Sequence, residues 1–223
     1  MMFPNDWLES LRLRLQGPLP GRTAQYRMAS RRRIEELKDL PSPPADAHVA
    51  CVLNLLHWRG NMWHTVLIRR STNPHDRHSG QISFPGGRWQ ITDGALVNAA
   101  LRETEEEIGV PFDAVEIIGQ LTELYIPVSH FLVFPFVGVL KKALSFRPQT
   151  SEVADILTPP LSLLTASESR KITDITLVSG LVLRDTPYFD IDGHVVWGAT
   201  AMILSEFLEI IPPLENTPQP LLS

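Results

Sequence analysis

Residues 86–110 read GGRWQITDGALVNAALRETEEEIGV, and this stretch decides what kind of protein the chain is. Its spacing predicts a helix over residues 94–108. Gly109 directly after the helix and Pro111 just beyond it are the usual stop signals. The segment therefore reads as a turn opened by two glycines, followed by one helix with a defined end.

The predicted helix has an apolar face and an acidic face at about 100° per residue. Four residues form a stripe that can pack on a core: Val97, Leu101, Thr104 and Ile108. Glu103, Glu106 and Glu107 follow the spacing i, i+3 and i+4, so they share a different face, roughly opposite. Ala99 and Ala100 lie one turn earlier near the acidic face, and their small side chains predict room for a ligand there.

The three carboxylates repel one another, at a cost of roughly 0.2–0.5 kcal/mol per pair on an exposed helix. They also lie in the last turn, where the helix dipole disfavours negative charge. A bound cation removes both penalties, and oxygen ligands without cysteine suit Mg²⁺ or Mn²⁺. The alternative is a solvated acidic face, but the preceding glycines, Arg102 and Gly109 favour a metal site.

The pattern resembles the Nudix box of the Nudix hydrolases, GX5EX7REUXEEXGU with U apolar. Gly87 opens the box, Arg102 and Glu103 supply the RE pair, and residues 106–110 close it. Asp93 stands where the family has glutamate, and the gap from it to the RE pair is one residue longer. A third departure is a threonine, residue 104, at a position that is usually apolar.

The first two departures resemble one branch, the coenzyme A pyrophosphatases, whose box is similar to FPGG-x4-5-D followed by ALREAxEE. Residues 67–71 with 80–87 resemble an additional signature of the same branch, in which Arg77 is a loose match to an arginine. Residues 151–154 with 160–161, and residues 196–201, resemble further segments of that branch. Residues 20–28 resemble an N-terminal extension of some members. The resemblance covers most of residues 20–210.

This resemblance implies a metal-dependent enzyme that cleaves the diphosphate of coenzyme A or acyl-CoA. The products are 3′,5′-ADP and 4′-phosphopantetheine or its acyl form. Glu103, Glu106 and Glu107 are the implied metal ligands and catalytic residues, and Arg102 pairs with one of these carboxylates and orients it. The cofactor is Mg²⁺ or Mn²⁺, which neutralises the diphosphate and lowers the pKa of a bound water.

A second set of residues is expected to bind substrate: Arg70, Ser71, Gly80, Phe84, Gly86 and Gly87. Glycine lets the backbone turn sharply and approach a ligand, and this role is favoured for Gly86 and Gly87 over the alternative of a plain turn. Arginine suits bidentate contact with a phosphate. Asp93 is either a helix cap or a residue behind the metal ligands, and Glu152 is either a distant metal or base residue or a surface glutamate.

Two other functions compete with this interpretation. The first is a Nudix hydrolase of another nucleoside diphosphate-X, such as ADP-ribose or NADH, because the box determines the bond type and not the group X. The second is a non-catalytic binding module of the same fold. Intact Glu103, Glu106 and Glu107 argue against such a module, since losing one of them is the simplest route to it.

Composition limits the remaining classes. The 223 residues are 43% hydrophobic and 20% charged, which is typical of a globular chain with a sizeable core. The net charge of −5 disfavours non-specific nucleic-acid binding. A single cysteine excludes a disulfide scaffold. No apolar run approaches the roughly 20 residues of a membrane span and the N-terminus does not resemble a leader, so we expect a cytoplasmic protein without membrane contact. The expected partner is a CoA-like nucleotide substrate, and a homodimer is compatible with the sequence.

The expected fold class is α/β (α+β), a Nudix-type α/β/α sandwich with a mixed β-sheet and an N-terminal helical extension. Strands are predicted over residues 48–58, 64–70, 115–123, 131–140, 175–184 and 187–197, and further helices near 31–39 and over 199–211. Prolines around residues 41–44 predict a boundary. The expected division is an extension over residues 1–44, a Nudix domain over 45–213 and a tail over 214–223.

Overall fold

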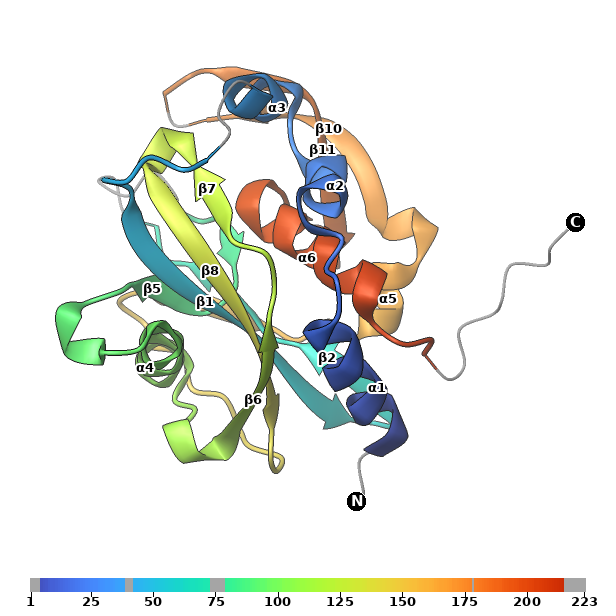
Figure 1. The fold of residues 1–223 in the computed structure, drawn as a ribbon. Coiled ribbons are helices and arrows are strands. Elements are labelled where there is room, and N and C mark those ends of the chain that lie inside the picture. Colours follow the sequence, from blue (N-terminus) through green and yellow to red (C-terminus); the bar gives the residue numbers. More distant parts are fainter. Residues whose placement is uncertain (1–4, 39–41, 73–78, 178, 215–223) are drawn as a thin grey trace, which may run out of the picture.

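The computed structural model describes residues 5–38, 42–72, 79–177 and 179–214. Its centre is a mixed sheet in the order β2-β1-β8-β6, extended by β5 beside β1 and β7 beside β8 (Figure 1). The strands are β1 His48–Arg59, β2 Met62–Thr65, β5 Gly86–Arg88, β6 Val115–Gln120, β7 Leu124–Ile126 and β8 Phe131–Leu140. β1 and β8 are parallel and the other pairs of this sheet are antiparallel, which confirms the predicted mixed sheet.

Helices cover both faces of this sheet, because its central strands bury both sets of alternating side chains. Leu53 and Leu55 of β1 belong to the core beneath α4, whereas Leu56 belongs to the core beneath α6. The helices are α1 Asn5–Gln16, α2 Gly21–Gln25, α3 Arg31–Lys38, α4 Leu96–Ile108, α5 Leu161–Thr165 and α6 Gly198–Ile210. The predicted α/β/α sandwich is therefore confirmed.

Two small sheets flank the central one, in the orders β4-β3-β9 and β10-β11-β12. Their strands are β3 Leu67–Arg70, β4 Ile82–Ser83, β9 Val153–Leu157, β10 Arg170–Thr176, β11 Val182–Ile191 and β12 His194–Val196. The strand predicted over residues 64–70 is wrong as one element, because it divides at Val66 and its halves join different sheets. Asp192 and Gly193, at φ 50° and 85°, form the tight turn between β11 and β12.

The N-terminal helices pack into the same core as α6. Trp7 of α1 stacks on Trp63 with ring centroids 5.0 Å apart, and its indole N–H donates to the carbonyl of Pro212 at 3.2 Å. The buried Glu206 of α6 accepts hydrogen bonds from the Gln25 side-chain amide at 2.8 Å and the Thr122 hydroxyl at 2.6 Å. These contacts tie α1 and α2 to the body of the fold, while the division at residue 44 stays a prediction.

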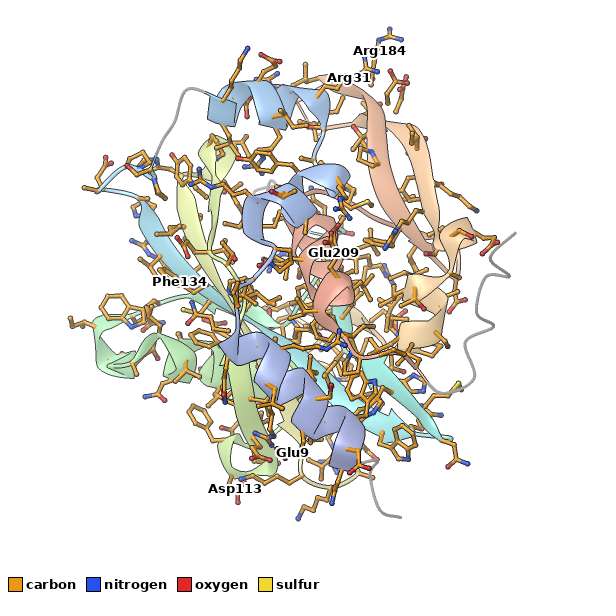
Figure 2. All side chains as sticks on the ribbon, turned by 45° about the vertical axis from the view of Figure 1, so that its right-hand side comes forward. Glu9, Arg31, Asp113, Phe134, Arg184 and Glu209 are labelled. Atoms are coloured by element: carbon orange, nitrogen blue, oxygen red, sulfur yellow. The ribbon has the colours of Figure 1, made fainter. Side chains whose placement is uncertain are left out.

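Different elements form the two ends of the molecule. At one end, Arg31 of α3 lies beside Arg184 of β11, and at the other end Glu9 of α1 and Asp113 are found (Figure 2). Within the part of the chain that the structure describes, no helix is long and apolar enough to span a membrane. Short 3-10 turns complete the fold: η1 Tyr26–Met28, η2 Ile91–Asp93, η3 Phe112–Ala114, η4 Pro127–Ser129 and η5 Ser167–Ser169.

Candidate active site

The helix that carries the three glutamates is α4, and its ends follow from the local sequence. Gly109 adopts the left-handed conformation at φ 70°, and its N–H donates to the Glu105 carbonyl at 2.9 Å, which ends the helix as predicted. The helix begins at Leu96, two residues later than expected. The reason is Gly94, whose φ of 68° ends the preceding turn η2.

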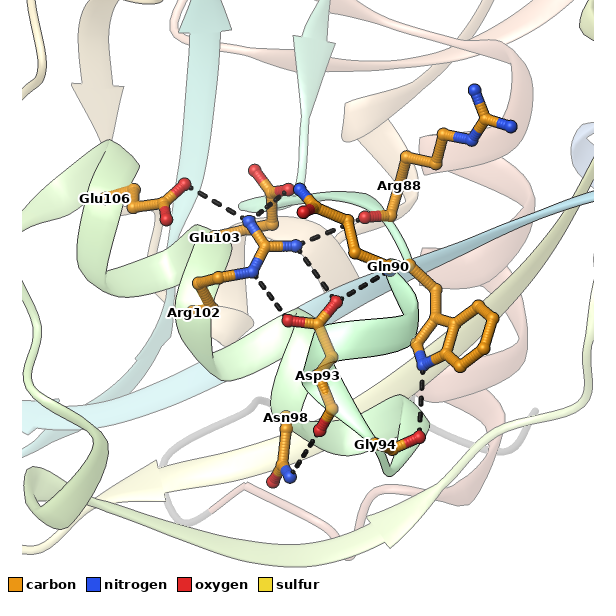
Figure 3. Close-up of polar contacts among 9 residues, drawn as sticks. Arg88, Gln90, Asp93, Gly94, Asn98, Arg102, Glu103 and Glu106 are labelled. Atoms are coloured by element: carbon orange, nitrogen blue, oxygen red, sulfur yellow. Dashed lines mark hydrogen bonds and ion pairs between the residues drawn. The ribbon is translucent and has the colours of Figure 1, made fainter.

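Arg102 is the centre of a polar network in front of α4 (Figure 3). Its Nε donates to the Asp93 carboxylate at 2.7 Å, and its Nη1 donates to Glu103 at 2.8 Å and to Glu106 at 3.2 Å. The Asp93 side chain is only 3% exposed, and its hydrogen bond from Arg102 lowers the pKa of that carboxyl. Asp93 also accepts the Gln90 N–H at 2.8 Å, so it caps η2 and holds Arg102 at the same time.

Glu103 lies directly against the backbone of Gly87. A Cβ atom at Gly87 would be 2.4 Å from Cδ of Glu103, so no other residue leaves space for this carboxylate. Burial raises the pKa of Glu103, and the negative charges of Glu106 and Glu152 add to that effect, whereas Arg102 opposes it. Gly87 is therefore required because it leaves space for the Glu103 carboxylate, and not because its backbone needs a positive φ.

Glu107 is the most buried carboxylate of the site, at 2% exposure. Its Oε2 accepts the N–H of Gly86 at 2.9 Å, and burial raises its pKa to about 8, with further contributions from Glu103 and Glu152. Arg70 and the Gly86 N–H act in the opposite direction. A carboxylate buried this deeply, with so little positive charge beside it, favours the neutral form until a cation arrives.

The predicted face of α4 is partly wrong. Glu107 shares the buried face with Ala99 and Ala100, which pack fully into the core and leave no room for a ligand. Only Glu106, with 58% of its side chain exposed, lies on an open face. The predicted open face of α4 is buried by segments that are distant in the sequence, because β5 and the loop over residues 147–152 cover it.

The loop over residues 147–152 contacts the end of α4 in a way that the sequence did not predict, although Glu152 was itself a candidate site residue. The N–H groups of Arg147 and Gln149 donate to the carbonyls of Ile108 and Glu107, each at 2.9 Å. These donors satisfy the last carbonyls of α4, which have no partner inside the helix. The loop thereby brings Glu152 close enough to raise the pKa of both Glu103 and Glu107.

The predicted substrate residues divide into those near the carboxylates and those that are not. Arg70 ends β3 near Glu107, and the Ser71 N–H donates to the Glu152 carbonyl at 2.8 Å. Gly80 is exposed at φ 72° with open space around it. Phe84 requires a correction, because it is 2% exposed and packs in the core with α6, away from any ligand. Arg77 lies outside the described residues.

Residues 48–174, more than half of the chain, match the protein family described as NUDIX domain. The chain belongs to the Nudix family. A Nudix relative from Photorhabdus laumondii, named Uncharacterized Nudix hydrolase NudL, is 34% identical over 145 residues, which are 65% of this chain and 76% of the relative. The protein of the same name from Yersinia enterocolitica is 32% identical over 160 residues, 72% of this chain and 80% of the relative.

Solved Nudix structures resemble the chain more distantly. A MutT/nudix family protein from Enterococcus faecalis is 16% identical, with a TM-score of 0.49 over 88% of this chain and 76% of that one. The NUDIX domain of Shewanella oneidensis NrtR, complexed with ADP ribose, is 18% identical, with a TM-score of 0.44 over 58% of this chain and 84% of that one. The family assignment rests on the sequence match, and it makes the chain a Nudix hydrolase, an enzyme of a family that generally uses divalent metal ions.

The chemistry of the donor set fits a divalent cation. Glu103 and Glu107 are buried carboxylates with raised pKa values, and a cation beside them compensates the cost of their charge. As the side chains stand, no three acidic, histidine or cysteine groups of the described residues converge on one point. Arg102 donates to Oε1 of Glu103 and to Oε2 of Glu106, so the second oxygen of each carboxylate is the one available to a metal.

Proposed function

We propose that this Nudix hydrolase cleaves the diphosphate of coenzyme A or acyl-CoA, giving 3′,5′-ADP and 4′-phosphopantetheine or its acyl form. The observation that carries the proposal is the packing of Glu103 and Glu107 on Gly87 and Gly86, since these glycines end the segment that resembles the coenzyme A branch. The rest of that segment supports the same reading. Residues 67–71 contain β3, and residues 80–87 contain β4 and the start of β5; β5 packs against α4, and Arg70 at the end of β3 lies near Glu107.

Each residue has a separate task in the proposed reaction. Glu103, Glu106 and Glu107 hold Mg²⁺ or Mn²⁺, and the bound metal supplies charge neutralisation of the diphosphate and an activated water. Arg102 positions Glu103 through the 2.8 Å hydrogen bond, and Asp93 fixes Arg102 from behind. Arg70 holds a substrate phosphate, a task that suits its planar fork of donors.

The remaining proposals concern the surroundings of the site. Ser71, Gly80, Gly86 and Gly87 line the proposed substrate site. Gly80 has open space around it, whereas the N–H groups of Ser71 and Gly86 already donate to the Glu152 carbonyl and the Glu107 carboxylate. The sole cysteine, Cys51, takes no part, because it is fully buried in β1 and burial raises its pKa to about 12. A homodimer, a cytoplasmic location and the division into residues 1–44, 45–213 and 214–223 stay predictions.

Mg²⁺ is expected to stabilise the enzyme more strongly as the pH rises. The pKa of Glu107 rises from 4.5 to about 8 on folding, so the folded chain binds more protons than the unfolded chain between these values. Metal-free stability therefore falls as pH increases through this window, and a cation that replaces the proton restores it. Differential scanning fluorimetry at several pH values, with and without Mg²⁺, measures the effect. A Mg²⁺-induced shift in Tm that is the same at low and high pH, or unchanged by Glu107→Gln, contradicts it.

A substrate panel tests the proposed specificity. At saturating Mg²⁺, kcat/KM for coenzyme A should exceed that for ADP-ribose or NADH by at least about tenfold, because only coenzyme A offers the groups that the branch-like segments are proposed to bind. A reaction without metal, in EDTA, is the control. Equal or reversed preference favours the alternative Nudix activity on another nucleoside diphosphate-X.

A further inference from the structure

A basic cluster lies at the end of the central sheet next to the two glycines of the box. Arg88 follows Gly87 in β5 and pairs with Ala50 of β1. His48 lies two residues before Ala50 in the same strand. Paired residues of antiparallel strands point to the same face, and so do residues two apart in one strand. Arg88 and His48 therefore share the face opposite to Glu103, and Nη2 of Arg88 lies 3.5 Å from Nδ1 of His48.

The guanidinium of Arg88 is not used by the catalytic network. Arg102 contacts only its carbonyl, at 3.2 Å, and the side chain points away from the carboxylates (Figure 3). Within the described residues, no carboxylate lies in ion-pair range of Arg88, and no hydrogen bond engages Nε2 of His48. Two exposed donors without an acid beside them form a site that is complementary to an anion.

A second histidine, His130, packs against His48 and holds it in position. The His130 ring packs edge-on against His48, with centroids 5.9 Å apart, and the His48 N–H donates to the His130 carbonyl at 2.9 Å. Both ring nitrogens of His130 are engaged, one 2.8 Å from the Tyr125 hydroxyl and the other 3.3 Å from the Asp46 carboxylate. His130 is thus a positioning residue, and Arg88 and His48 are the groups left to face a ligand.

We propose that Arg88 and His48 recognise a phosphate on the ribose of the substrate, which in coenzyme A is the 3′-phosphate; this inference rests on the proposed function. Cα of Arg88 is about 3.8 Å from Cα of Gly87, and a Cβ at Gly87 would contact Glu103, so the strand that carries Arg88 adjoins the carboxylates. Half-buried apolar side chains on the same face as Arg88 and His48, namely Ala50 and Phe131, provide a surface on which the sugar and base can pack beside the cluster.

The test compares coenzyme A with 3′-dephospho-coenzyme A, which lacks only that phosphate. The wild-type enzyme should have at least about tenfold higher kcat/KM for coenzyme A, and Arg88→Gln should lose at least about tenfold more activity on coenzyme A than on the dephospho form. His48→Gln should act in the same direction. Arg184→Gln, which removes the same charge from the exposed end of the β10–β11 hairpin, is the matched control and should keep the preference.

A binding measurement separates recognition from turnover. By calorimetry in the absence of metal, 3′,5′-ADP should bind the wild type at least about tenfold more tightly than AMP, and Arg88→Gln should remove most of the difference. Equal wild-type kcat/KM for the two coenzymes, or an equal loss of both in Arg88→Gln, overturns the inference and leaves the proposed function standing. Absence of cleavage of both coenzymes, with turnover of ADP-ribose, overturns the proposed function instead.

Discussion

Glu107→Gln should lower kcat by about 10²- to 10⁴-fold while leaving the fold intact. The carboxylate is 2% exposed and its pKa is raised to about 8, so the metal-free enzyme at neutral pH already holds a neutral group there. Glutamine has nearly the same shape, and its carbonyl oxygen can still accept the Gly86 N–H. The substitution therefore removes the charge that a metal needs without disturbing the packing.

The matched control for this variant is Glu105→Gln, which makes the same change at an exposed position of the same helix. Steady-state rates at saturating Mg²⁺ and thermal melts of both variants in EDTA are the measurements. We expect the Tm of metal-free Glu107→Gln to equal or exceed that of the wild type above neutral pH, because a buried charge is gone. A Glu107→Gln enzyme with wild-type kcat would remove this residue from the metal site.

Replacing each of the two glycines of the box by alanine should have a different effect, on stability at Gly86 and on kcat at Gly87. At Gly86, φ is +150° and a Cβ would lie 2.3 Å from the carbonyl oxygen of Cys51, so the backbone of β1 or β5 must move. Gly86→Ala should lower the free energy of unfolding by about 2–4 kcal/mol. At Gly87 the clash is with the flexible end of Glu103, so Gly87→Ala should fold normally and lose about 10²-fold or more in kcat.

Urea unfolding and steady-state kinetics on the two variants separate these effects. Gly17→Ala is the matched control, because a Cβ at Gly17 meets its nearest atom at an ordinary 3.5 Å. If Gly87→Ala has the wild-type kcat, Glu103 does not need its present position. If Gly86→Ala is as stable as the wild type, the close approach of β5 to β1 is not maintained in solution.

The sequence predicted most of the long elements of the fold and missed the short ones. The strands predicted over residues 175–184 and 187–197 are wrong in their bounds, because the structure has β10 Arg170–Thr176, β11 Val182–Ile191 and β12 His194–Val196. The continuous apolar runs of β1 and β8 indicate strands buried on both faces, and the structure places them at the centre of the sheet. The pair Asp192-Gly193 correctly predicts a turn. α2 and α5, with 5 residues each, are too short to show a helical period. The change of sheet at Val66 depends on pairing with distant β9, which no local pattern contains.

The candidate site was predictable in its residue types and only partly in its geometry. The spacing of the box places three glutamates on one helix, but a helical wheel shows angles and not the segments that cover each face. Glu107 is buried because Gly86 and the loop over residues 147–152 close over it from elsewhere in the chain. The sequence did not predict a role for Arg88, because only the pairing of β5 with β1 brings it beside His48.

Mass analysis of the products from coenzyme A and Mg²⁺ tests the central claim most directly. The active site is proposed to cleave the bridging diphosphate and to leave the 3′-phosphate, a monoester outside the metal-bound group, intact. The predicted result is equimolar 3′,5′-ADP and 4′-phosphopantetheine, abolished by EDTA and by Glu107→Gln. Inorganic phosphate as the primary product, or no turnover of coenzyme A at saturating metal, would contradict the account.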